Sequence, residues 1–179
     1  MRRSTLILLA LCFLSAPAAL ADNPSPAQVA ASAFVQKFYD WYVPIALNRN
    51  LKEDSSNVAI AKRGALFDPP LLKALKEDVE AARKTPDDIV GLDFDPFLAS
   101  QDPDDKYVVG EVSEKDGHYL VNVYGIRKGK KREAKPNVVA EVKPAKNSFV
   151  FTNFLYGDDG DLVAVLKQLA DDRAHPAPE

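Results

Sequence analysis

The hydrophobic pattern of this 179-residue chain changes its period once. Up to about residue 84 apolar residues recur every three or four positions, as on one face of an α-helix, whereas from residue 107 they alternate in short segments rich in β-branched and aromatic residues. Hairpin turns between these segments leave no room for the crossover helices that parallel strands need. The sequence therefore predicts an α+β fold, in which N-terminal helices pack on a curved antiparallel sheet of four strands or slightly more and a helix follows at the C-terminus.

The first predicted helix has a clear start signal. Ser25 is a good N-cap, Pro26 suits the first helical position, and Gln28 stands three residues after the cap, as in a capping box. Pro44 disfavours helical geometry at Val43, so we expect the helix to end or kink there.

Two later helices carry a similar signal. Asp68 followed by Pro69 predicts a helix that ends near Lys84, and Asp161 predicts a last helix over Leu162–Asp171. The predicted strands are Tyr107–Val112, Tyr119–Ile126, Asn137–Val142 and Phe149–Tyr156. Hairpin turns are predicted at 115–117 and 144–147.

Even composition predicts a single domain over residues 29–172. A flexible lead-in at 22–28 precedes it, and a disordered tail at 173–179 follows it, where two prolines cannot continue a helix.

The first 21 residues have the pattern of a secretory signal peptide. Arg2 and Arg3 precede an apolar run that is too short to span a bilayer, and an A-x-A site predicts cleavage between Ala21 and Asp22. The mature protein is then periplasmic or secreted. A lipid anchor at Cys12 is not expected, because Leu11 stands where a lipoprotein signal needs a small residue. Loss of Cys12, the one cysteine, would leave no thiol for a disulfide or a metal site.

The sequence lacks the motifs of several enzyme classes. It has no HExxH, no GxSxG, no Walker loop and no glycine fingerprint, and it contains two histidines. We therefore expect no bound metal and no cofactor. A net charge of −3 and the absence of a recognition motif argue against nucleic acid as a partner. No segment after the leader is apolar over the length of a transmembrane helix.

Residues 91–105 hold five acids interleaved with apolar residues, and three interpretations remain open. In the first, the acids cap turns while Phe94, Phe97 and Leu98 pack the segment against the core. In the second, they bind a hard cation, although the spacing does not match the twelve-residue calcium loop. Alternatively, Asp93, Asp95 or Asp102 is an acid/base group, with Tyr39 or Tyr42 as hydrogen-bond donor.

Candidate binding residues come from two groups. The aromatic residues of the first helix favour the core, but Tyr39 falls off the apolar stripe and is a candidate for a cavity rim. The basic run at 127–135 carries six positive residues and one negative residue, and predicts either a solvated loop or an electrostatic contact with anionic envelope components. The candidates are Tyr39, Trp41, Tyr42, Phe97, Gln101, Lys128, Lys130, Lys131 and Arg132.

Three strings in the chain resemble a known family: FVQKFYDWY at 34–42, LFDPPLL at 66–72 and DPFLASQD at 95–102. In their order they resemble an uncharacterised family of bacterial exported proteins and lipoproteins that is known as a domain of unknown function. The resemblance implies the cone-shaped fold of nuclear transport factor two and ketosteroid isomerase. It implies no catalytic residues.

The leading functional hypothesis is an exported, non-enzymatic domain that binds a small apolar ligand or a protein partner. One alternative is a carboxylate and tyrosine enzyme, isomerase-like or hydrolase-like, in the same fold. A second alternative is an immunity-type inhibitor of a toxin.

Overall fold

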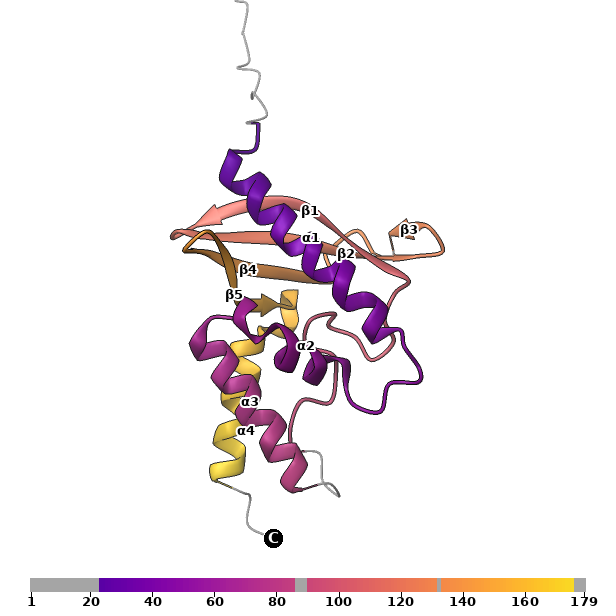
Figure 1. Cartoon of the computed structure of the whole chain (residues 1–179), viewed down its shortest axis with the longest axis vertical. Coiled ribbons are helices and arrows are strands. Elements are labelled where there is room, and N and C mark those ends of the chain that lie inside the picture. Colours follow the sequence, from indigo (N-terminus) through magenta and orange to yellow (C-terminus); the bar gives the residue numbers. More distant parts are fainter. Residues whose placement is uncertain (1–22, 86–89, 132, 176–179) are drawn as a thin grey trace, which may run out of the picture.

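The computed structural model describes residues 23–85, 90–131 and 133–175. This part of the chain contains four α-helices and an open, antiparallel five-stranded sheet, which confirms the predicted α+β class (Figure 1). The helices are α1 (Pro26–Ala46), α2 (Ser55–Arg63), α3 (Pro69–Lys84) and α4 (Leu162–Ala174). The strands are β1 (Lys106–Lys115), β2 (His118–Arg127), β3 (Lys130–Lys131), β4 (Val138–Ala145) and β5 (Ser148–Leu155).

The sheet has the order β1-β2-β4-β5, and the two-residue strand β3 pairs antiparallel with the last two residues of β2. Alternation along β2 buries Tyr119, Val121 and Val123 on the face that α1 covers. Register shifts interrupt the pairing of β1 with β2 and of β4 with β5. Such bulges bend the strands that carry them and increase their local twist.

The hairpin turns lie close to their predicted places. Asp116 and Gly117, both with positive φ, connect β1 to β2, as the sequence predicts. The predicted turn at 144–147 is displaced, because Pro144 and Ala145 belong to β4 and the turn itself is formed by Lys146 and Asn147. Pro144 is tolerated in the strand because β4 ends there and the residue is exposed.

Helix α1 begins as predicted but does not end as predicted. The capping box is present, since the Ser25 hydroxyl accepts from the Gln28 amide and the Gln28 side chain accepts from the Ser25 amide. The expectation that α1 ends at Pro44 is wrong, because α1 continues to Ala46. Pro44 has no backbone N–H to donate, but the later amide of Leu47 still donates to the Val43 carbonyl at 2.9 Å and completes the last turn of the helix. Burial of Val43 in the core holds this turn in place.

Aromatic rings fill the space between α1, the sheet and the segment at 95–98. Phe38 lies 4.9 Å from Phe151 and 5.6 Å from Phe97, measured between ring centroids, and Phe97 lies 5.0 Å from Phe154. Tyr39 stacks on Tyr107 at 5.8 Å. The face of the sheet that α1 covers is therefore occupied by the protein's own side chains at this point.

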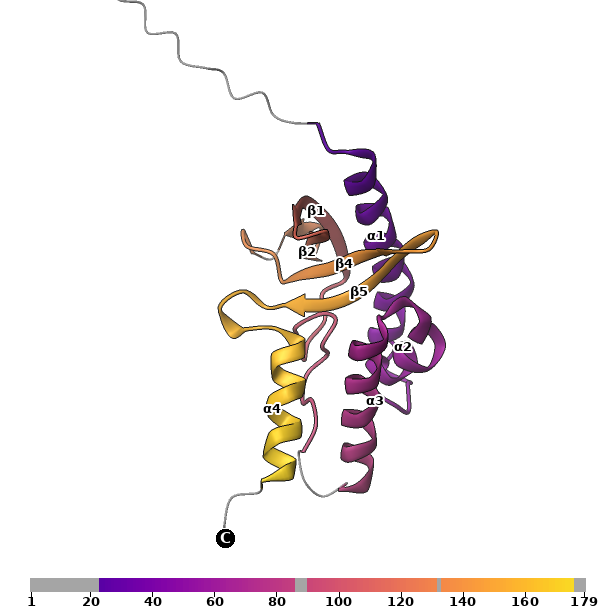
Figure 2. The same cartoon turned by 90° about the vertical axis from the view of Figure 1, so that its left-hand side faces the viewer.

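Helices α3 and α4 pack side by side below the sheet (Figures 1 and 2). The carboxylate of Asp78 on α3 is buried, and it accepts from the Arg173 guanidinium at 2.8 Å and from the Leu92 amide at 3.0 Å. Arg173 also donates to the Val90 carbonyl at 2.7 Å. Helix α1 includes residues 26–28 and α4 extends to Ala174, so the two helices reach into the segments that were predicted as a flexible lead-in and a disordered tail. None of the helices in the described ranges is both long and apolar enough to cross a bilayer.

Candidate functional site

Two surface depressions of opposite charge are each lined in part by α1 and α2. The first, which we call the α1 groove, has a volume of about 440 Å³. Its walls come from α1, from the end of α2 and the turn after it, and from the β4–β5 turn, which extends beside α1 in Figure 2. The lining residues are Ala30, Ala33, Phe34, Lys37, Phe38, Trp41, Arg63, Leu66, Asn147, Ser148 and Phe149.

Helical spacing brings the α1 residues of the groove onto one face. Phe34, Lys37 and Trp41 stand three and four positions apart, so they project from the same side of the helix. Ala30 and Ala33 continue this face toward the start of α1, and their small side chains leave the groove open there. Across the groove, Phe149 lies 6.0 Å from Phe34 between ring centroids.

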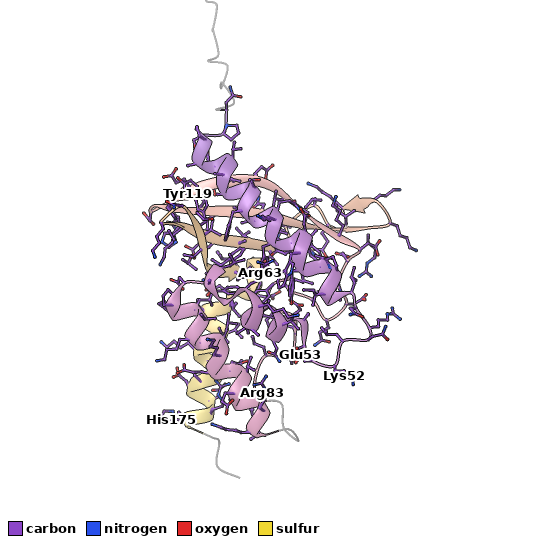
Figure 3. The ribbon with its side chains drawn as sticks, viewed as in Figure 1. Lys52, Glu53, Arg63, Arg83, Tyr119 and His175 are labelled. Atoms are coloured by element: carbon purple, nitrogen blue, oxygen red, sulfur yellow. The ribbon has the colours of Figure 1, made fainter. Side chains whose placement is uncertain are left out.

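The charges of the groove are positive. The Arg63 guanidinium stands over the Trp41 ring at 5.0 Å from its centroid, beside α1 in Figure 3. Neither Arg63 nor Lys37 forms an ion pair with a carboxylate anywhere in the described ranges. The lining contains no acidic residue, so the two cations give the groove a net positive charge.

The second depression, which we call the acidic cleft, has a volume of about 560 Å³. Asp54, Asp93 and Asp95 contribute three carboxyl groups to its lining, and no Lys or Arg is present there. The other lining residues are Ala46, Ser55, Ser56, Leu92, Phe94, Ser100, Gln101 and Pro103.

The Asp95 carboxyl group is enclosed by four hydrogen-bond donors. Its Oδ2 accepts from the Tyr42 hydroxyl at 2.5 Å and from the Ser55 hydroxyl at 2.9 Å. Its Oδ1 accepts from the backbone amides of Phe97 and Leu98 at 3.0 and 3.2 Å. Burial raises the pKa of this carboxyl above its ordinary value, although the hydrogen bonds act in the opposite direction. Burial, and then the charge of Asp95, also raises the pKa of Tyr42.

Several predicted site residues are core residues. The interpretation of Tyr39 as a cavity-rim residue is wrong, because its ring is 1% exposed and its hydroxyl donates to the Phe97 carbonyl at 2.7 Å. Tyr42 and Phe97 are 0% exposed, and their rings pack together at 5.3 Å. Tyr39 lies off the main apolar stripe of α1 because it packs against Tyr107 on β1. Helix α1 thus has a second buried face, which a prediction based on one apolar stripe does not include.

The acids of 91–105 separate in space. Asp93 and Gln101 are exposed at the acidic cleft, where the Gln101 amide donates to the Asp93 carbonyl. Asp102 is exposed outside it and pairs with Arg127 at 3.0 Å. Asp104 is fully buried and accepts from Arg127 at 2.7 Å. In the described ranges no three acidic, histidine or cysteine side chains are arranged to hold a metal ion.

The first residue of the basic run, Arg127, forms ion pairs within the protein. Arg127 donates to Asp102 and Asp104, and these interactions raise the pKa of its guanidinium. Lys128 is exposed in the β2–β3 turn and Lys130 is exposed in β3. The ammonium group of Lys131 lies 3.7 Å from the Tyr124 ring centroid. Arg132 lies outside the described residues, as does the predicted cleavage site at Ala21 and Asp22.

Sequence reasoning did not single out Lys37, Ser55, Arg63 or Phe149. Lys37 interrupts the apolar face of α1, and this interruption in the sequence pattern could have indicated that part of the face is exposed. Ser55, Arg63 and Phe149 carry no such signal, because they reach these depressions from elements that are distant in the sequence.

Comparisons with protein families, curated proteins and solved structures find no match for this chain. The resemblance to the exported family, and the cone-shaped fold that it implies, stay predictions.

Proposed function

We propose that this protein is an exported bacterial protein that binds a small, largely apolar ligand in the α1 groove. The observation that carries the proposal is the groove itself: a depression whose lining is mainly apolar and includes Phe34, Trp41 and Phe149, with few polar groups. Its volume lies within the range of about 300–1,000 Å³ that is typical of small-molecule sites. The signal-peptide pattern of residues 1–21 supports export.

Two further features support binding at the groove. Trp41 is partly exposed there and Phe149 is half-buried, so apolar surface is available to a ligand. Phe151, which is buried, packs against Phe34 at 5.0 Å and supports the groove floor from the core side. A ligand in the groove would therefore bury apolar surface against a supported wall.

An acid/base enzyme that uses the acidic cleft is the second candidate. The contact between Asp95 and Tyr42, beside a cleft and with a raised carboxyl pKa, favours it. Its weakness is that the single protons of Tyr42 and Tyr39 are donated to Asp95 and to the Phe97 carbonyl, so neither is available to a ligand. The same bonds hold the 95–98 turn in place without any catalytic role.

Ligand capture tests the first candidate. Ala33→Phe fills the groove from an exposed position on α1, and Ala170→Phe makes the same change on the exposed side of α4. Native mass spectrometry of protein isolated from the periplasm should show a retained small molecule in wild type and in Ala170→Phe, and a reduced amount in Ala33→Phe. Equal retention by all three proteins would place the ligand elsewhere.

The same preparation tests export and the enzyme candidate. N-terminal sequencing should begin at Asp22. Incubation of the released ligand with wild type and with Asp95→Asn should leave it chemically unchanged in both. Conversion by wild type and not by Asp95→Asn would favour the enzyme instead.

A further inference from the structure

We infer that the α1 groove selects single-chain amphiphiles with a carboxylate headgroup, whose apolar chain lies along α1 and whose carboxylate pairs with Arg63 and Lys37. The inference rests on the proposed binding function and adds the class of ligand and its orientation.

The charge of the groove favours an anionic ligand. Two cations and no carboxylate line it, in a chain whose net charge is −3. Arg63 and Lys37 make no ion pair in the described ranges, so an incoming carboxylate does not have to displace a protein carboxylate. The acidic cleft has the opposite lining and would repel the same ligand.

The position of the cations sets the orientation of such a ligand. Arg63 is held over the Trp41 ring at one end of the groove, and its planar fork suits bidentate pairing with a carboxylate. Lys37 is one helical turn before Trp41 on the same face of α1. Phe34 and Phe149 lie toward the opposite end, next to Asn147 and Ser148. The groove thus has the Arg63 guanidinium at its Trp41 end, the Lys37 ammonium midway along α1 and the aromatic pair of Phe34 and Phe149 toward the other end, so a carboxylate can lie between the two cations while its chain runs toward the aromatic pair.

The length of the groove favours a small amphiphile over a macromolecule. Ala30 and Trp41, the first and last α1 residues of the lining, are eleven residues apart, or about 16 Å along the helix axis. Stable protein–protein interfaces bury roughly 1,200 Å² or more in total, which demands a much longer contact. A single acyl chain of medium length matches this distance, so we take decanoate as the probe.

Trp41 makes the site directly observable, because it is the single tryptophan of the chain and lines the groove. Three probes share one chain and differ in charge: decanoate, decan-1-ol and decylamine. Each is titrated below its micellar concentration, with Trp41 fluorescence and isothermal titration calorimetry as readouts. We expect decanoate to bind most tightly, decan-1-ol more weakly, and decylamine most weakly.

Two variants test the headgroup contacts. Arg63→Gln and Lys37→Gln should each weaken decanoate binding by about three- to fivefold, the effect of one partly exposed ion pair, and leave decan-1-ol binding nearly unchanged. Lys73→Gln is the matched control, because Lys73 is exposed on α3 and pairs with Glu77 away from the groove. Calorimetry is the readout for Arg63→Gln, since loss of the guanidinium changes Trp41 fluorescence by itself.

The outcomes separate the inference from the function on which it rests. Equal binding of decan-1-ol and decanoate, blocked by Ala33→Phe, would overturn the carboxylate inference and keep the groove as a ligand site. If none of the three probes binds and no ligand is retained, both the carboxylate inference and the proposed ligand-binding function are wrong. A dimer in sedimentation experiments that Ala33→Phe dissociates would make a second copy of the chain the occupant, and would also overturn the inference.

Discussion

At the scale of single residues, Asp95 shows how one side chain organises a loop. Each of its two oxygens accepts two hydrogen bonds. One oxygen accepts from α1 and from α2, and the other accepts from two backbone amides of its own turn. Burial opposes the ionised form, while the four donors favour it. Burial is the larger effect, so the carboxyl keeps its proton to higher pH in the folded protein than in the unfolded chain.

This balance predicts a pH-dependent stability difference. Above the ordinary aspartate pKa of about 4, the unfolded chain loses the proton before the folded protein does, so Asp95 reduces stability as the pH rises. Asp95→Asn carries no charge, and its free energy of unfolding should therefore increase relative to that of wild type as the pH rises from about 3 to 7. Urea unfolding of both proteins across this range measures the difference.

Asp93→Asn is the control for that experiment, because it removes a carboxylate two residues away from an exposed position. If the stability difference changes with pH as much in Asp93→Asn as in Asp95→Asn, burial of Asp95 is not its cause.

At the scale of elements, aspartate caps stabilise the starts of α3 and α4. Asp68 accepts from the Leu71 amide at 3.0 Å and Asp161 accepts from the Ala164 amide at 3.0 Å. Asp68 has a second role, since its other oxygen accepts from Lys143 on β4 at 2.9 Å. Its own amide donates to the Phe151 carbonyl on β5, so this cap also ties α3 to the sheet.

Asp68→Ala should therefore destabilise the protein more than a cap alone does. We expect a loss of about 2 kcal/mol, composed of the cap and the broken contact with Lys143. Asp161→Ala, which removes a cap without an ion pair together with the hydrogen bond from the Asn153 side-chain amide at 2.9 Å, should lose about 1 kcal/mol. Chemical denaturation gives both values, and equal losses would show that the contact with Lys143 contributes no more to stability than the hydrogen bond from Asn153.

At the scale of the whole molecule, charge is separated between surfaces. The α1 groove is lined by cations, the acidic cleft by carboxylates, and the buried Asp78 and Asp104 are paired with arginines. The Arg173 ion pair joins α4, the last helix, to α3 and to the segment at 90–92.

Arg173→Ala should loosen the attachment of α4. The change leaves Asp78 buried with one of its two partners, so we expect a loss of about 2–3 kcal/mol. Hydrogen exchange should show faster exchange in α4 than in wild type, with little change in β2. Lys167→Ala, at an exposed position on the same helix, is the control. Slow exchange throughout α4 in Arg173→Ala would show that apolar packing alone holds the helix.

Local signals in the sequence determined much of the fold. The capping box at Ser25, the Asp-Pro start at Asp68 and the alternation along β2 act over a few neighbouring residues, and each is present as predicted. The predicted end at Pro44 was wrong, because α1 continues for two residues beyond it beside the buried Val43, and a local pattern does not report such burial.

Only the tertiary structure decided which residues meet. Asp95 with Ser55 and Tyr42, Arg63 with Trp41, and Phe149 with Phe34 come together from separate elements. Their sequence spacing contains no information about these contacts, because packing of the helices against the sheet sets them. The sequence by itself thus determined the class of fold and the charged segments. The packing decided that Tyr39 and Tyr42 are buried and that the partly exposed Trp41 and Phe149 lie in a groove lined by two cations.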